Sequence, residues 1–274
     1  MVGLLRRAYT SLQIRIKEFP LVELVDSSST NFRTQRIPLI CYQTWTNEFL
    51  GRTHHSEVTK FREINKDLSW KLFIDSEMTE YMKENWGHHP IYEIYDKAIF
   101  GPMKADIFRY CILFDRGGYY FDISKGCNIP ITSLHEPSAT ALISYEKNEC
   151  LIPPGSEFSL VSAEPTKVVL QWGFGFVAQH GILGRAIQLI VENHGNYSGR
   201  IFSSPKDAIL AFTGPGLFTR AVRETLSLFK KGEIQEAGID FKSGGIPALP
   251  GANIRYFTTP HYTQFTDSPI LRGT

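Results

Sequence analysis

Residues 104–124, with the sequence KADIFRYCILFDRGGYYFDIS, constrain the fold more than any other part of the chain. Their first part predicts a helix with an apolar side, since hydrophobic residues recur there at helical spacing: Ile107, Cys111, Ile112 and Phe114. The pair Gly117-Gly118 ends that helix, because glycine adopts the left-handed backbone conformation at low cost. The aromatic residues 119–121 then predict a short buried strand. Asp122 follows at its carboxyl end, where open α/β sheets bind their ligands.

Two charged residues of the predicted helix are candidates for ligand contacts. Asp106 and Arg109 stand three residues apart and therefore share one face. A carboxylate that accepts hydrogen bonds and a guanidinium that donates them in a rigid fork can together hold a diol. A structural ion pair is the alternative at this spacing. Lys104, at the start of the same helix, is a further candidate for contact with phosphate groups.

Strands alternate with helices along the chain, which predicts an α/β fold with a mostly parallel central sheet. Further strands are expected at 37–42, 70–74, 141–145 and 173–178, and helices at 56–65, 75–86, 91–98, 183–192, from Ser204 and over 216–230. Ser76 is a candidate N-cap of the second helix. The sequence predicts an N-terminal amphipathic segment and linker over residues 1–35 and one domain over residues 36–274.

Three motifs, in this order along the chain, resemble glycosyltransferase family 32. Residues 37–45, IPLICYQTW, resemble the family's opening I-P-x-I-x-x-Q-T-W. Residues 106–124 resemble its sugar-binding region, in which D-x-x-R-Y, a glycine pair and an aromatic strand precede a D-x-D motif. Residues 213–216, TGPG, resemble a later T-G-P turn. The family includes yeast Golgi mannosyltransferases and bacterial capsule-sugar transferases, and the resemblance implies a GT-A type, Rossmann-like nucleotide-sugar-binding fold.

The activity that the resemblance implies is that of a retaining glycosyltransferase. Such an enzyme moves a hexose from a UDP- or GDP-hexose donor to a hydroxyl of a saccharide, glycolipid or protein, with Mn²⁺ or Mg²⁺ as the divalent cation. The chain departs from the family at Ser124, which replaces the second acid of the D-x-D motif. A neutral hydroxyl is a poorer ligand for these cations than a carboxylate. The alternative is therefore a catalytically reduced member that binds nucleotide sugar or glycan.

The resemblance implies catalytic roles for Asp122, Asp106 and Arg109, and a metal site formed by Asp122, Ser124 and His261. The donor-binding residues that it implies follow the predicted strand ends and the motif helix: Gln43, Thr44, Trp45, Lys104, Asp106, Arg109, Tyr110, Gly118, Tyr120, Asp122, Ser124 and Gly173. Structural roles are the alternatives for several of them, such as a core position for Trp45 and a tight strand crossing at Gly173. The pairs His54-His55 and His88-His89 are expected to be solvated loop residues.

Composition and charge limit the classes of partner that the protein could bind. A formal net charge of +1 argues against a general nucleic-acid binder. The chain has no apolar run of transmembrane length, of about 18 residues. Residues 1–19 are basic and amphipathic, which favours a packing helix or a loose terminus over the alternative of a helix at a membrane surface. The expected location is cytoplasmic or peripheral to a membrane in a bacterium or virus, or the Golgi lumen if an anchor has been removed.

Overall fold

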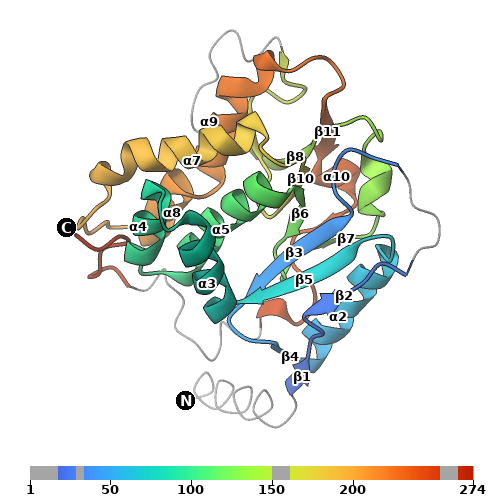
Figure 1. Ribbon diagram of the computed structural model, residues 1–274, viewed down its shortest axis with the longest axis horizontal. Coiled ribbons are helices and arrows are strands. Elements are labelled where there is room, and N and C mark those ends of the chain that lie inside the picture. Colours follow the sequence, from blue (N-terminus) through green and yellow to red (C-terminus); the bar gives the residue numbers. More distant parts are fainter. Residues whose placement is uncertain (1–17, 29–33, 150–160, 254–264, 274) are drawn as a thin grey trace.

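A central sheet organises the computed structural model, which describes residues 18–28, 34–149, 161–253 and 265–273. Within these residues the sheet has eight strands in the order β11-β8-β10-β6-β3-β5-β2, and β9 pairs with β8 (Figure 1). These strands are β2 (Leu24–Val25), β3 (Ile40–Trp45), β5 (Ser69–Ile74), β6 (Gly118–Phe121), β8 (Ala141–Glu149), β9 (Lys167–Val169), β10 (Gly173–Phe176) and β11 (Ile234–Ile239). Two small sheets pair β1 (Glu18–Pro20) with β4 (Phe49–Gly51), and β7 (Gly126–Cys127) with β12 (Gly245–Ile246).

Helices cover both faces of the central sheet. The described helices are α2 (Arg52–Ile64), α3 (Asp75–Trp86), α4 (Pro90–Lys97), α5 (Gly101–Arg116), α7 (Gly181–Asn193), α8 (Pro205–Phe212), α9 (Pro215–Thr225) and the short α10 (Asp240–Ser243). In Figure 1, α2 lies apart from the group formed by α3, α4, α5, α7, α8 and α9. The core divides accordingly: Tyr120 of β6 belongs to the cluster under that group, and its neighbours Tyr119 and Phe121 belong to the cluster on the α2 side. This alternation follows from the period of two in a strand.

The α/β class is confirmed, but the sheet is mixed where the sequence predicted a mostly parallel one. β3 runs parallel to β5 and β6, and β11 runs parallel to β8. In contrast, β10 is antiparallel to both β6 and β8, and β2 is antiparallel to β5. A short buried strand has the same apolar pattern in either direction, so the sequence of β10 carries no signal of its orientation.

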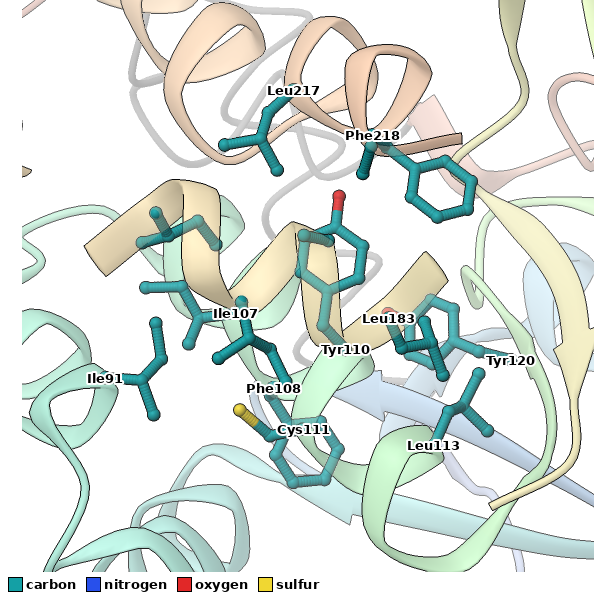
Figure 2. Close-up of a cluster of buried hydrophobic side chains, with 14 of the residues drawn as sticks. Ile91, Ile107, Phe108, Tyr110, Cys111, Leu113, Tyr120, Leu183, Leu217 and Phe218 are labelled. Carbon is teal, nitrogen blue, oxygen red and sulfur yellow. The ribbon is translucent and has the colours of Figure 1, made fainter. Parts of the chain in front are cut away.

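The helix α5 is buried on nearly all sides. Its buried apolar residues include Ile107, Phe108, Tyr110, Cys111 and Leu113, which pack with α7 and α9 (Figure 2). Each large apolar side chain removed from water contributes about 1.5–3 kcal/mol. The helix ends where the sequence predicted, at Gly117, whose φ is 67°. Because residues 106–113 of the helix are all buried, Asp106 and Arg109 lie in the interior as well.

Several boundaries differ from the sequence predictions. The first strand of the domain, β3, covers Ile40–Trp45, whereas a strand was predicted over 37–42, so Gln43, Thr44 and Trp45 are its last residues. Ser76 is not an N-cap: α3 begins one residue earlier, and the carboxylate of Glu77 accepts the N–H of Ile74 at 3.1 Å. The domain boundary near residue 35 remains a prediction, although β2 from the N-terminal segment pairs with β5. In the described parts of the chain, no helix is both long and apolar enough to cross a membrane.

Candidate active site

The guanidinium of Arg109 links two carboxylates at the carboxyl end of β6. Its Nη2 lies 3.0 Å from Oδ1 of Asp122 and 3.3 Å from Oδ1 of Asp106. Its Nη1 donates to the carbonyl of Gln171 at 2.9 Å, and its Nε donates to the carbonyl of Ala105 at 3.2 Å. With a side chain only 5% exposed, Arg109 forms with Asp106 the ion pair that was the structural alternative at this spacing, and the pair is buried. Burial acts to lower its pKa, but the carboxylates of Asp122 and Asp106 oppose burial and the pKa is raised, so Arg109 keeps its charge.

Asp106 is buried beside Arg109, with a side chain 9% exposed. Its two oxygens accept hydrogen bonds from Nε2 of Gln171 and from Oγ1 of Thr213, each at 2.9 Å. Burial raises the pKa of Asp106 from 3.8 to about 6, and Arg109 with these hydrogen bonds only partly opposes that rise. The carboxylate therefore joins α5 to the segment before β10 and to the end of α8, and it titrates near neutral pH.

The raised pKa of Asp106 predicts a pH-dependent contribution to stability. Between about pH 4 and 6 the folded protein binds more protons at this group than the unfolded chain, so this contribution falls as the pH rises through that window. A shift of about two units corresponds to about 3 kcal/mol. We expect the free energy of unfolding of the parent, minus that of Asp106→Asn, to decrease by about that amount from pH 4 to pH 7. Urea unfolding of both proteins measures the difference, and a gap independent of pH would contradict a titrating Asp106.

A hydrogen-bonded chain fixes the carboxylate of Asp122. The hydroxyl of Tyr120 donates to Oδ1 of Asp122 at 3.0 Å, and lies 2.8 Å from Oγ1 of Thr44. Since the single hydroxyl proton of Tyr120 goes to Asp122, the hydroxyl of Thr44 donates to Tyr120. Burial, with Asp122 adding to it and Arg109 opposing it, raises the pKa of Tyr120 far above its ordinary value, so Tyr120 remains a donor. The ring of Tyr120 also lies 4.5 Å from the guanidinium of Arg109.

The described residues could hold a divalent cation only if a bound ligand supplied further oxygen atoms to it. Oδ1 of Asp122 is taken by Arg109 and Tyr120, and its side chain is 29% exposed. Ser124 is half-buried in the turn that follows, and His261 lies outside the described residues. Among the residues that the structure describes, no group of three acidic, histidine or cysteine side chains is arranged to hold a metal. Mg²⁺ commonly takes one or two carboxylates and completes its shell with substrate phosphates and water, and Asp122 fits that role.

Other predicted donor contacts lie away from this centre. Oε1 of Gln43 accepts from Nε and Nη2 of the buried Arg62 of α2, at 3.1 and 2.9 Å. The ring of Trp45 packs edge-on against His54, with 5.7 Å between centroids. The ammonium of Lys104 lies 5.1 Å from the centre of the Tyr95 ring. Of the three residues that end β3, Thr44 is therefore the one bonded toward Asp122.

Three further predicted donor-binding residues make contacts that are typical of packing positions. Tyr110 is fully buried, and its hydroxyl donates to the carbonyl of Thr213 at 2.8 Å. Gly118 has a φ of 104°, and a Cβ there would lie 2.7 Å from the carbonyl oxygen of Ile40. A Cβ at Gly173 would lie 2.8 Å from the ring of Phe121. These contacts support the packing alternative for both glycines.

Sequence reasoning missed two neighbours of the site. Gln171 bonds Asp106 through its side chain and Arg109 through its carbonyl, and no sequence pattern singled it out. His54, expected to be solvated, is buried, and its Nε2 lies 2.9 Å from the carbonyl oxygen of Ile123 in the motif. Burial lowers the pKa of His54, so it is a neutral donor there. His89 also differs from expectation, because its ring accepts the N–H of Ile91 at the start of α4.

The sequence matches a known family over the part of the chain that forms this centre. Residues 10–141 match the model described as the glycosyltransferase sugar-binding region containing the DXD motif. Inositol phosphoceramide mannosyltransferase 1 of Schizosaccharomyces pombe is 28% identical over 130 residues, which cover 46% of this chain and 40% of that protein. Inositol phosphoceramide mannosyltransferase 3 of the same yeast is 31% identical over 104 residues, covering 37% and 28%. The chain thus matches well under half the length of these relatives.

A solved structure shares the fold over most of the chain. The PaToxG glycosyltransferase superimposes with a TM-score of 0.51 and 15% sequence identity, over 82% of this chain and 80% of that one. At that identity the likeness concerns the fold alone. The likeness to a family rests instead on the sequence match, which includes α5, β6 and the Asp122 turn. Over residues 10–141, this chain is similar to the glycosyltransferases whose sugar-binding region contains the DXD motif, the family that its motifs resemble.

Proposed function

We propose that this chain is a retaining glycosyltransferase that moves a hexose from a nucleotide sugar to a hydroxyl acceptor. The observation that carries the proposal is the fixed carboxylate of Asp122, held by Arg109 and Tyr120 at the carboxyl end of β6. Open α/β sheets bind ligands at this edge. Arg109 and Asp106 supply the donors and acceptors that sugar hydroxyls require.

In this proposal, the donor is a UDP- or GDP-hexose and its diphosphate lies across the turn at Asp122. A bound Mn²⁺ or Mg²⁺ would neutralise the charge that develops on the departing diphosphate. Asp122 would hold that cation through its exposed side, while Arg109 and Tyr120 keep the carboxylate in place. The mannosyltransferase names of the yeast relatives support mannose as the hexose and a glycolipid as the acceptor.

The second candidate is a family member that binds a nucleotide sugar or glycan without efficient transfer. Ser124 favours it, because the motif reads Asp122-Ile123-Ser124 and offers one carboxylate where the family has two. The transferase and a nucleotide-sugar-binding form of the second candidate both predict donor binding, so turnover separates them. The proposed location, at or near a membrane, involves residues 1–19, of which residues 1–17 lie outside the described part of the chain.

A thermal-shift screen of nucleotide sugars tests the proposal. A ligand that binds the folded state at 100 times its Kd stabilises the protein by about 2.7 kcal/mol, which raises the midpoint of unfolding. We expect one UDP- or GDP-hexose to raise it, and more strongly with Mn²⁺ present. A panel in which no nucleotide sugar raises the midpoint, with or without Mn²⁺, would contradict the transferase and leave only a glycan-binding form of the second candidate.

The substitution Ser124→Asp distinguishes a weakened metal site from one that works without metal. A second carboxylate in the turn adds a hard anionic oxygen, so in a metal-assisted enzyme it should tighten Mn²⁺ binding and lower the Mn²⁺ concentration needed for half-maximal turnover. At a site without metal, the new charge should instead repel the donor diphosphate and weaken its binding. Calorimetric donor affinity across a Mn²⁺ titration, for the parent and the variant, decides between the two.

A further inference from the structure

The turn after β6 carries a lysine whose surroundings differ from those of the other charged groups at the site. The N–H of Lys125 donates to the carbonyl of Asp122 at 2.8 Å, so residues 122–125 form one turn. The side chains of Asp122 and Lys125 therefore extend from the same short turn. Ser124 lies between them, and its carbonyl accepts the N–H of Leu249 at 2.8 Å.

Asp122 and Lys125, the two charged residues of this turn, have partners of different kinds. Arg109 neutralises Asp122 at 3.0 Å, so the acid is already paired. The ammonium of Lys125 donates to the neutral carbonyl of Pro247 and lies 5.8 Å from the centre of the Trp172 ring. None of the ion pairs among the described residues involves Lys125. The charge of Lys125 affects the carboxyl of Glu146 from beyond ion-pair distance. Burial raises the pKa of Glu146, and Lys125 partly opposes that rise.

A lysine bound to a carbonyl and a ring can exchange them for an anion. Its four-carbon stem is flexible and its ammonium is a point charge with three donors. A phosphate oxygen forms a charge-assisted hydrogen bond, which is stronger than one to a neutral carbonyl. The diphosphate of a nucleotide sugar, on departure, needs positive charge at this turn.

We propose that Lys125 binds the diphosphate of the nucleotide donor and supplies part of the positive charge that a second metal-ligating acid would otherwise bring in. This assignment rests on the proposed function. In the motif Asp122-Ile123-Ser124-Lys125, position 124 lacks the acid of the family, and the next residue is a cation that has no carboxylate partner among the described residues. The ligand class is a nucleoside diphosphate, recognised through its phosphates rather than through its base.

The test measures the binding of UDP, GDP and the matching monophosphates by calorimetry, in EDTA and in Mn²⁺. For the diphosphate that the parent prefers, Lys125→Met should weaken binding in EDTA by about tenfold, the loss of one charge-assisted hydrogen bond. Binding of the monophosphate should change less, which a general loss of structure would not produce. Lys125→Arg should retain most of the affinity, since it keeps the charge.

Lys60→Met is the matched control, because Lys60 lies on the outer side of α2 with a side chain 66% exposed. It should leave both affinities unchanged. Equal diphosphate affinity for the parent and Lys125→Met in EDTA would overturn the assignment of Lys125 and leave the proposed function standing. A parent that binds neither diphosphate under either condition would overturn the proposed function, and this assignment with it.

Discussion

Asp122→Asn is expected to abolish sugar transfer while the protein stays folded. The amide oxygen can still accept from Arg109 and Tyr120, so the geometry at the end of β6 survives, whereas the negative charge is lost. Electrostatic groups at a reacting centre are typically worth about 100-fold or more in turnover. We expect a loss of at least about that size, measured as the rate of nucleoside diphosphate release with acceptor present.

Asp96→Asn is the control for this experiment, since Asp96 is an exposed residue of α4. Its turnover should match the parent's. Both variants should show cooperative thermal unfolding, which separates a lost reaction from a lost fold. Parental turnover in a folded Asp122→Asn variant would contradict the assignment of the site.

Arg109→Lys is expected to destabilise the fold by about 3 kcal/mol, an unusually large effect for a change that conserves charge. The guanidinium spans two carboxylates and the carbonyls of Ala105 and Gln171. An ammonium is a single point and cannot reach all of them, so at least one buried polar group is left without its partner. Urea unfolding at pH 7 measures the loss, and donor affinity should fall with it.

Arg116→Lys, at the end of the same helix, provides the comparison. Its guanidinium is 49% exposed and lies 3.8 Å from Asp115, and exposed pairs of this kind contribute about 0–1 kcal/mol. We expect its free energy of unfolding to stay close to the parent's. Equal stability of Arg109→Lys and Arg116→Lys would contradict the network described around Arg109.

The sequence predicted the parts of this site that depend on local pattern. The spacing of Asp106 and Arg109, the stop at Gly117 and the strand before Asp122 each involve neighbours within one or two turns of chain, where periodicity and backbone preference decide the outcome. The structure confirms the helix, the stop and the strand. The family resemblance, carried by motifs in order, was confirmed by the match over residues 10–141.

Contacts between distant segments could not be predicted in the same way. Gln43 stood at a predicted strand end and was expected to meet the donor, but α2 places Arg62 against it from 19 residues away. Thr213 was part of a recognised motif, yet its bond to Asp106 joins residues 107 apart. Such pairings depend on how helices pack across the sheet, which the spacing of residues within one element does not encode.

The direction of β10 and the burial of His54 could not be predicted for the same reason. The apolar run of β10 fits a parallel or an antiparallel strand equally well, and only its neighbours β6 and β8 fix it. His54 was predicted to be solvated beside His55, but the start of α2 turns His54 toward the carbonyl of Ile123, while His55 is partly buried against Phe19. Burial of a polar ring requires a partner, and that partner lies 69 residues away in the chain.

The most direct test of the central claim is transfer itself. The whole chain is incubated with UDP- and GDP-hexoses, a glycolipid or saccharide acceptor and Mn²⁺, and the product is followed by mass spectrometry together with the released nucleoside diphosphate. The account predicts that the parent adds one hexose to the acceptor and releases one diphosphate, and that Asp122→Asn, folded, does neither at a comparable rate. Turnover that is the same in both proteins, or a folded parent that binds and consumes no nucleotide sugar, would contradict it.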